Sequence, residues 1–222
     1  MRRTTTSKAG RAEPWHAHAW QTQSLLLAYP DEHEQFTHCL SLARRTAVPL
    51  PGPVRDPLLA FVEHAERTTP SDLAAAYVAT FDHCKRCCPY LTYYAHGDTR
   101  KRGVALLRLK QTYAAAGLRL SEDELPDHLA VVLEFAAADP PAGRRLLTEH
   151  RAGVELLRLA LREERSAWAA VLDSVSATLP PLKGDEREAV ARLAAEGPPD
   201  EQVGLAPYMP PQFMPDPAGG PR

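Results

Sequence analysis

Apolar residues recur at steps of three and four along most of the chain, the spacing of one face of an α-helix. The first such stretch predicts a helix from Trp15 to Tyr29, and a second covers about Glu32 to Thr46. The proline-rich segment 48–53 predicts a loop, because proline and glycine cluster there. A third helix is expected from about Asp56 onward.

The middle of the chain predicts two long helices separated by a glycine turn. Ser71 or Asp72 suits the cap of a helix that continues through the following aromatic residues toward Tyr94. Gly97 then turns the chain, and the next helix ends at Gly117, which occupies the position of a C-cap glycine.

Helical spacing continues through the C-terminal half. Ser121 and Glu124 have the spacing of a capping box, and Pro126 suits a first helical position, so we expect a helix from there to about Ala138. Beyond it, apolar positions keep helical spacing up to Pro180, and the segment 185–195 favours one more helix.

These patterns favour an all-α fold with a single domain of seven or more helices, since no strand-like alternation of useful length appears. We expect a flexible N-terminal tail over 1–14 and an all-helical domain over 15–196. The remainder, 197–222, contains eight prolines and four glycines and predicts a disordered tail.

Composition narrows the classes of function. The chain has 26 Lys and Arg against 28 Asp and Glu, so no overall positive field favours nucleic acid. No apolar run reaches the roughly 18 residues of a spanning helix, so we expect no membrane insertion. The basic N-terminus lacks the apolar core of a secretory signal, which favours a cytoplasmic protein.

Three of the four cysteines crowd together, a layout that suits a reducing compartment better than a disulfide framework. Cys84 and Cys87 have the spacing of half a zinc site, with Cys88 beside them, but no second pair follows. We therefore expect no bound metal and no cofactor of the protein's own. A small zinc or redox protein using this cluster stays open as an alternative.

Three cations, Arg100, Lys101 and Arg102, occupy the first turn of a predicted helix, where the helix dipole disfavours positive charge. Either internal carboxylates or a partner should compensate them. The acidic candidates within the chain are Asp82, Glu124, Asp127 and Glu134. Gly103 follows inside the same helix, where glycine is unfavourable, so we expect it to mark a helix crossing.

The sequence E-L-P-D-H, Glu124 to His128, places two carboxylates and an imidazole at one helix start. Catalysis by His128 would need an oriented carboxylate and a nucleophile, yet sequence neighbours on a helix do not face one another. We therefore expect no enzyme. Tyr90 and Tyr94 are four residues apart, and such rings can line a groove that accepts an amphipathic helix.

Two long motifs, F-D-H-C-K-R-C-C-P-Y-L-T-Y-Y-A-H-G-D-T-R-K-R-G and E-L-P-D-H-L-A-V-V-L-E-F, resemble the NarJ family of nitrate reductase assembly chaperones. The segments S-L-L-L-A-Y-P-D-E and E-G-P-P-D-E-Q-V-G-L-A-P-Y are similar to that family as well. Together the four segments extend over about four-fifths of the chain, in the family's order.

The resemblance implies a TorD-like all-helical chaperone that binds the immature catalytic (alpha) subunit of respiratory nitrate reductase. Such a chaperone recognises the subunit's N-terminal segment and promotes insertion of the molybdenum cofactor before membrane attachment, without joining the finished enzyme. Molybdenum cofactor insertion proteins are further candidate partners. A helical regulatory or scaffold module is the alternative.

By position in the family's motifs, the residues expected to bind the client are Tyr90, Tyr94, Arg100, Arg102, Glu124, Asp127 and His128. We read the basic turn and the E-L-P-D-H helix start as two walls of one groove. On this view, replacing Arg100 and Arg102 by Ala should weaken client binding more than it lowers the melting temperature.

Overall fold

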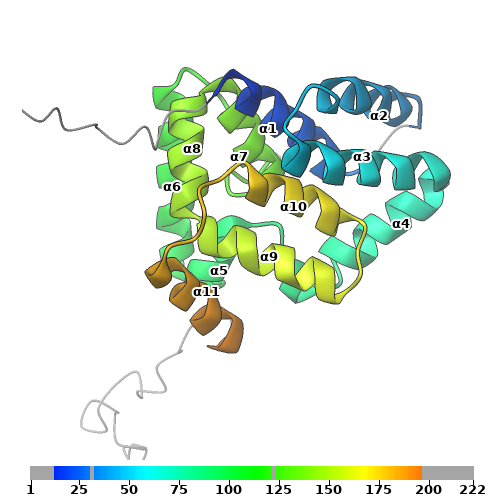
Figure 1. Ribbon diagram of the computed structural model, residues 1–222. Helices are drawn as coiled ribbons and strands as arrows, with labels where there is room; N and C mark the ends of the chain where they lie inside the picture. Colours follow the sequence, from blue (N-terminus) through cyan, green and yellow to red (C-terminus); the bar gives the residue numbers. More distant parts are fainter. Residues whose placement is uncertain (1–12, 31–32, 122–123, 197–222) are drawn as a thin grey trace, which may run out of the picture.

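The computed structural model describes residues 13–30, 33–121 and 124–196. Over these residues the chain forms eleven α-helices and one 3-10 turn, with a single isolated bridge pair in place of strands (Figure 1). The helices are α1 Pro14–Leu27, α2 His33–Ala47, α3 Gly52–Arg67, α4 Pro70–Phe81, α5 Leu91–His96, α6 Arg100–Ala115, α7 Leu129–Ala138, α8 Pro140–Glu149, α9 Arg151–Glu163, α10 Trp168–Ala177 and α11 Gly184–Glu196, and the 3-10 turn η1 is Lys85–Cys87. The predicted all-α class is confirmed.

Helix α1 lies at the centre of the packing, against α7, α10 and α2. Helix α10 packs in turn on α3 and α9, and α9 carries α5 and α11. Two buried side-chain bonds tie α1 to the α10 region: Trp20 Nε1 donates to Thr178 Oγ1 at 2.9 Å, and Gln23 Nε2 donates to Ser174 Oγ at 2.8 Å. These bonds join segments about 150 residues apart in the sequence.

Helix α3 begins earlier than the sequence suggested, at Gly52 and not near Asp56. The predicted loop over 48–53 therefore extends only as far as Pro51. Prolines are compatible with a helix start, because the first N–H groups of a helix have no intrahelical partner in any case. Pro53 takes the second helical position here.

The helix predicted from residue 71 toward Tyr94 is present only as far as Phe81, because the chain breaks there and starts a new helix at Leu91. Pro89 lies in the break; it lacks an N–H and disfavours helical backbone at the residue before it. The cap of α4 is Thr69, whose hydroxyl accepts from the backbone N–H of Asp72 at 3.2 Å.

Helix α7 begins at Leu129, three residues later than Pro126, where the sequence placed the start. His128 has extended backbone and serves as the N-cap, so Pro126 and Asp127 belong to the turn before the helix. Ser121 Oγ donates to Glu124 Oε2 at 2.7 Å, a bond within the loop and not a box on the helix.

Glycines explain one close helix crossing and one turn. A Cβ at Gly143 of α8 would lie 2.1 Å from Ala136 Cα of α7, so only glycine permits this approach. At Gly103, by contrast, no described atom beyond the adjoining backbone of its own helix lies within 4 Å of the Cβ position, so no helix among the described residues crosses α6 there. Gly97, with φ 56°, and Gly117, with φ 78°, occupy the expected turn and C-cap.

The predicted tails over 1–14 and 197–222 lie outside the described residues, apart from Glu13 and Pro14, where α1 begins. The short predicted helix over 185–195 is present as α11. Among the helices that the structure describes, none combines the length and the apolarity required to cross a membrane.

Candidate functional site

Two segments 35 residues apart meet in a corner beside α7. The Leu91 N–H donates to the Asp127 carbonyl and the Leu129 N–H donates to the Pro89 carbonyl, each at 2.9 Å. This pairing sets Tyr90 opposite His128, with their ring centroids 5.3 Å apart in an edge-to-face arrangement. We call the paired segments 89–91 and 127–129 the 90/128 corner.

The buried side chain of Asp127 stabilises the 90/128 corner. This side chain is fully buried, accepts a short hydrogen bond from Thr92 Oγ1, and lies 3.4 Å from Arg102 Nη2. Arg102 also pairs with Asp98 at 2.9 Å, and its guanidinium lies 5.5 Å from the centroid of the Tyr90 ring. One cation of the basic turn is thus compensated inside the chain.

His128 is held as a neutral ring. Its Nδ1 accepts a hydrogen bond from the Ala130 N–H at 3.3 Å, which caps α7. Burial lowers the pKa of His128, and the nearby carboxylates of Asp127 and Glu124 oppose this shift only in part. A neutral imidazole suits this position, because protonation of Nδ1 would remove the acceptor that caps the helix.

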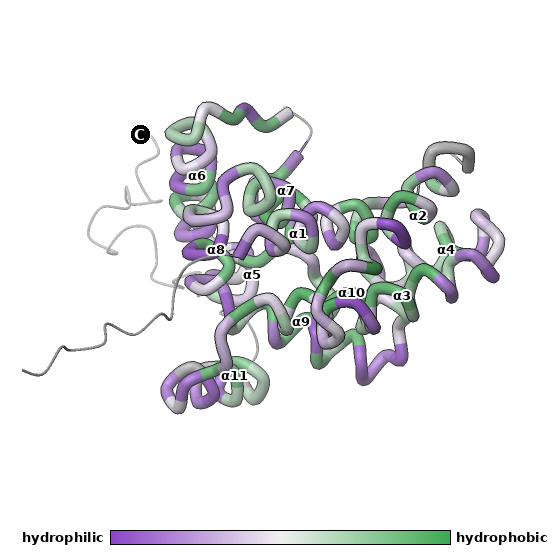
Figure 2. Tube along the Cα trace, turned by 45° about the horizontal axis from the view of Figure 1, so that its top comes forward, coloured by the Kyte–Doolittle hydropathy of each residue, from purple (hydrophilic) through white to green (hydrophobic). Residues whose placement is uncertain are grey.

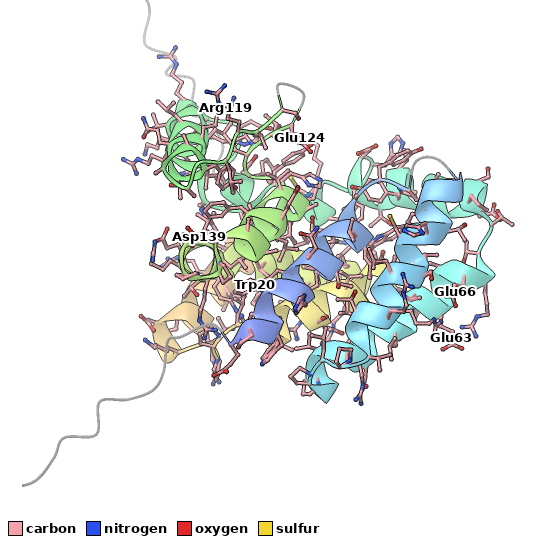
Figure 3. All side chains as sticks on the ribbon, turned by 90° about the horizontal axis from the view of Figure 1, so that it is seen from above. Trp20, Glu63, Glu66, Arg119, Glu124 and Asp139 are labelled. Carbon is pink, nitrogen blue, oxygen red and sulfur yellow. The ribbon has the colours of Figure 1, made fainter. Side chains whose placement is uncertain are left out.

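A groove of about 470 Å³ runs between α1, the 90/128 corner and α7. We call it the α1–α7 groove. It is lined by Gln21, Ser24, Leu25, Ala28, Tyr29, Tyr77, Tyr90, Glu124, Leu125, His128, Ala130, Val131 and Glu134. Figure 3 shows α1 lying beside α7, with Glu124 in the loop next to them. Both described carboxylates on the groove, Glu124 and Glu134, are exposed, so its edge is acidic.

The apolar part of the groove is open to solvent. Tyr29 is 50% exposed and Leu125 42% exposed, and both line the same groove, so they form an apolar patch and are not scattered single residues. Ser24 is the one serine among the groove's lining residues, and its Oγ donates a hydrogen bond to the Ala130 carbonyl at 2.8 Å. The groove therefore offers surface for binding and no activated nucleophile.

Two further hollows share lining residues with the groove. One of about 330 Å³ shares Tyr90 and Leu125 with it and reaches Arg102 and Lys85. The other, of about 160 Å³, shares Glu124, Val131 and Glu134 with it and reaches Leu118 and Phe135. Both cavities therefore adjoin the groove through lining residues that they share with it.

Three of the seven residues predicted to bind a client line the α1–α7 groove directly: Tyr90, Glu124 and His128. Arg102 lines the adjoining hollow and reaches the corner from α6. Arg100 is exposed on α6 and lines none of these three cavities.

The other two predicted residues lie beneath the surface. Asp127 is fully buried, and Tyr94 is 6% exposed. The Tyr94 hydroxyl shares its one O–H between the carbonyls of Arg86 and Cys88, at 3.0 and 2.9 Å, and burial raises the pKa of this phenol. Both side chains hold the segments that carry Tyr90, so their place in the site is that of supports.

The sequence reading missed the wall that α1 supplies. Leu25 and Tyr29 come from it, and the Tyr29 ring packs edge-to-face on Tyr77 at 5.4 Å. Tyr77 is fixed by donating its hydroxyl to the Leu27 carbonyl at 3.1 Å. The signal was present in S-L-L-L-A-Y-P-D-E, where an aromatic residue lies two positions beyond the last residue of α1 and precedes a proline.

The cysteine cluster has the character of packed thiols. Burial raises the pKa of Cys87 to about 12 and also raises the pKa of Cys88, so neither is a ready thiolate. All four cysteines are free. No three His, Cys, Asp or Glu side chains in the described part of the chain are placed to share a metal ion.

The fold has a counterpart among solved structures. The crystal structure of a redox enzyme maturation protein from Archaeoglobus fulgidus aligns with 79% of this chain and 98% of its own, with a TM-score of 0.55 and 20% identity. At that identity the likeness concerns the fold alone. The helical arrangement is therefore one found in a protein of that class.

Sequence comparison is more specific. The family described as nitrate reductase delta subunit matches residues 49–173. The molybdenum cofactor assembly chaperone NarJ of Bacillus subtilis is 36% identical over 159 residues, 70% of this chain and 85% of that protein. The chain belongs to the nitrate reductase delta subunit family, and the resemblance to NarJ proteins is confirmed.

Other relatives differ in length. The nitrate reductase-like protein NarX of Mycobacterium tuberculosis is 39% identical over 165 residues, 74% of this chain, yet the chain spans only 24% of NarX. NarJ of Escherichia coli is 31% identical over 68% of this chain and 64% of its own length. A region similar to this chain therefore also occurs as a part of a much longer polypeptide.

Proposed function

We propose that this protein is an assembly chaperone that binds the immature catalytic subunit of respiratory nitrate reductase. It holds the N-terminal segment of that subunit in the cytoplasm, promotes insertion of the molybdenum cofactor before membrane attachment, and does not remain in the finished enzyme. It acts without catalysis and without a cofactor of its own. Molybdenum cofactor insertion proteins are its further candidate partners.

The observation that carries the proposal is the open α1–α7 groove in a chain of this family. Its apolar residues, among them Leu25, Tyr29 and Leu125, suit the apolar stripe of an amphipathic helix. Its exposed carboxylates, Glu124 and Glu134, complement cations at the edge of such a helix and so orient it. The occupant is therefore a short helix with an apolar stripe and positively charged flanks.

The predicted residues divide into two roles. Tyr90, Glu124 and His128 touch the client, since they line the groove. Asp127 and Tyr94 position the corner from below. Arg102 does both, because it pairs with Asp127 and also lines the hollow next to Tyr90.

A peptide titration tests the proposal. The full chain is titrated with a labelled peptide that copies the first residues of the nitrate reductase catalytic subunit, and affinity is read by fluorescence anisotropy. Leu125→Ser should weaken binding about tenfold or more, as expected for the loss of one buried leucine contact. The melting temperature should change little, since Leu125 is 42% exposed before the client binds.

Leu159→Ser is the matched control, because Leu159 is equally exposed, at 41%, but lies on α9 away from the groove. Its affinity for the peptide should equal that of the unmodified chain. The proposal fails if the peptide does not bind, or if the two leucine variants weaken it alike. Unchanged nitrate reductase activity in a strain lacking the chain would then favour a regulatory or scaffold module.

A further inference from the structure

Helix α6 carries five cations and no carboxylate over Arg100–Ala115. Only Leu109 and Tyr113 of its sixteen residues are buried. Arg102 points inward to its two acidic partners, but the other four cations form no ion pair with any residue the structure describes. Those four are Arg100, Lys101, Arg108 and Lys110. Four cations without an ion-pair partner among the described residues are thus concentrated on one helix, although the net charge of the chain is −2.

Two aliphatic side chains project between these cations. Val104 is 54% exposed and Leu107 57% exposed. At 100° per residue they lie within about 60° of each other, with Lys101 and Arg108 on one side and Lys110 on the other. Figure 2 shows the helix as purple bands interrupted by green. We call the surface of Lys101, Gly103, Val104, Leu107, Arg108 and Lys110 the outer face of α6.

Gly103 adds an independent observation. Glycine inside a helix is destabilising relative to alanine and is retained where another backbone approaches closely. No described atom beyond the adjoining backbone of its own helix lies within 4 Å of the position a Cβ would occupy at Gly103, so no contact within the described chain requires it. No described part of the chain therefore supplies the close approach that would explain this glycine.

We propose that the outer face of α6 docks a helical segment of a partner protein, with an aliphatic stripe flanked by carboxylates, which crosses α6 at Gly103. The stripe covers Val104 and Leu107, and the carboxylates pair with the surrounding cations. An apolar centre with a charged rim is the usual anatomy of a protein interface. This surface shares no residue with the α1–α7 groove, so the proposal goes beyond the chaperone's client site.

The same observations argue against the other polyanions. A nucleic acid has no use for two exposed aliphatic side chains at the centre of the cations. A membrane surface favours aromatic and larger apolar side chains on the buried face, and it gains nothing from a glycine. The close approach that Gly103 permits is specific to another polypeptide backbone.

The test uses a designed, labelled helical peptide with Leu and Ala at positions i, i+3, i+4 and i+7 and Glu at the flanks. Anisotropy with the full chain should show binding in the range of about 10 to 100 µM, with affinity falling as salt is raised. A peptide of the same composition, shuffled so that the leucines share no face, is the control. No binding, or equal binding of the shuffled peptide, overturns the proposal.

Variants then locate the contact. Leu107→Ser should weaken binding about tenfold, and Lys101→Glu with Arg108→Glu more strongly. Leu159→Ser and Leu125→Ser should leave the affinity for the designed peptide unchanged, since neither residue lies on this face. Unchanged affinity in the α6 variants overturns the proposal, whatever the client peptide does at its own groove.

Gly103→Ala should change the stability of the chain and its affinity for the designed peptide in opposite directions. The added methyl group meets open space in the chain, so the melting temperature should rise by about 2 °C. Binding of the designed peptide should nevertheless weaken about fivefold, because the methyl group holds the partner's backbone away. A rise in melting temperature with unchanged affinity overturns the crossing at Gly103.

Three further measurements complete the design. Vesicles containing phosphatidylserine and a DNA duplex of mixed sequence should bind more weakly than the peptide at equal salt. Light scattering across a concentration series should show no self-association that Leu107→Ser removes. Tighter binding of vesicles or DNA, or an association of copies through this face, overturns the assignment to an acidic partner protein.

Discussion

Helices α6 and α7 follow one another in the sequence but differ in burial, since α6 is mostly exposed and α7 is mostly buried. Seven of the ten residues of α7 are buried, and α1 and α8 cover it. Only two of the sixteen residues of α6 are buried, although α6 is the longer helix. The features of α7 are explained by contacts among the described residues, whereas four of the five cations, the two exposed aliphatic side chains and the glycine of α6 are not.

The contrast teaches where to look for a partner. A glycine inside a helix, a cation at a helix start or an exposed leucine indicates a binding surface only where no contact within the chain accounts for it. Gly143 has such an explanation in Ala136, and Arg102 has one in Asp127. The α1–α7 groove and the outer face of α6 have no such internal explanation among the described residues. We therefore propose them as the surfaces that bind other molecules.

The largest effect of a substitution is expected at the crossing of α7 and α8, where a contact within the chain requires glycine. We expect Gly143→Ala to lower the free energy of unfolding by more than about 3 kcal/mol, because its Cβ would meet Ala136 Cα at 2.1 Å and force two helices apart. Urea unfolding followed by circular dichroism measures this change. A loss below about 1 kcal/mol would show that the helices separate easily.

The next effect is expected at Asp127. Asp127→Ala should cost about 3 kcal/mol of unfolding free energy, because it leaves Arg102 and Thr92 without their buried partner. Asp98→Ala removes the exposed partner of Arg102 and should cost less than about 0.5 kcal/mol. Thermal melts of both variants check the order, and equal losses would contradict the supporting role given to Asp127.

A smaller effect is expected from pH at the N-cap of α7. Since burial lowers the pKa of His128 below its unfolded value of 6.5, the unfolded chain takes up the proton first as the pH falls. The stability that the neutral ring contributes is complete above the unfolded pKa, declines below about pH 6.5, and levels off under the folded pKa.

Unfolding free energies measured between pH 7.5 and 5 test this sign. His128→Asn retains a capping acceptor without a titrating ring, so its stability should fall less over the same range. Burial also lowers the pKa of His16 and His150, so the variant keeps part of the decline. An identical pH dependence with and without His128 would exclude it as a contributor.

The smallest effect has the opposite sign and belongs to α6. Gly103→Ala should raise the free energy of unfolding by about 0.5 to 1 kcal/mol, because it adds no contact shorter than 4 Å within the described chain beyond the adjoining backbone of its own helix. Differential scanning calorimetry can resolve such a gain. A destabilised variant would mean that Gly103 has an internal role after all, like that of Gly143.

Much of the fold could be predicted from helical spacing, because burial of one helix face leaves a direct periodic signal. The starts of helices were less predictable. Pro53 was read as part of a loop although proline suits a first turn, and Pro126 was read as a helix start although His128 is the cap. In each case the local preference of proline fits two conformations, and tertiary contacts select one.

The site was predictable in part. Tyr90, Glu124 and His128 were found through family motifs, and they do line one groove. Tyr94 and Asp127 belong to the same motifs, yet only the structure shows that they are buried. The contribution of Tyr29 depends on α1 lying against α7, a pairing of distant segments that no local pattern in the sequence reports.

That pairing has a consequence for the protein's own synthesis. The α1 wall of the groove leaves the ribosome early, but Val131 and Glu134 opposite it follow about a hundred residues later. The partners of Trp20 and Gln23 in the core are Thr178 and Ser174, further on still. At 5 to 20 residues per second, α1 therefore waits roughly 8 to 30 seconds before its contacts with α10 can form. For that interval the nascent chain is itself a polypeptide in need of protection.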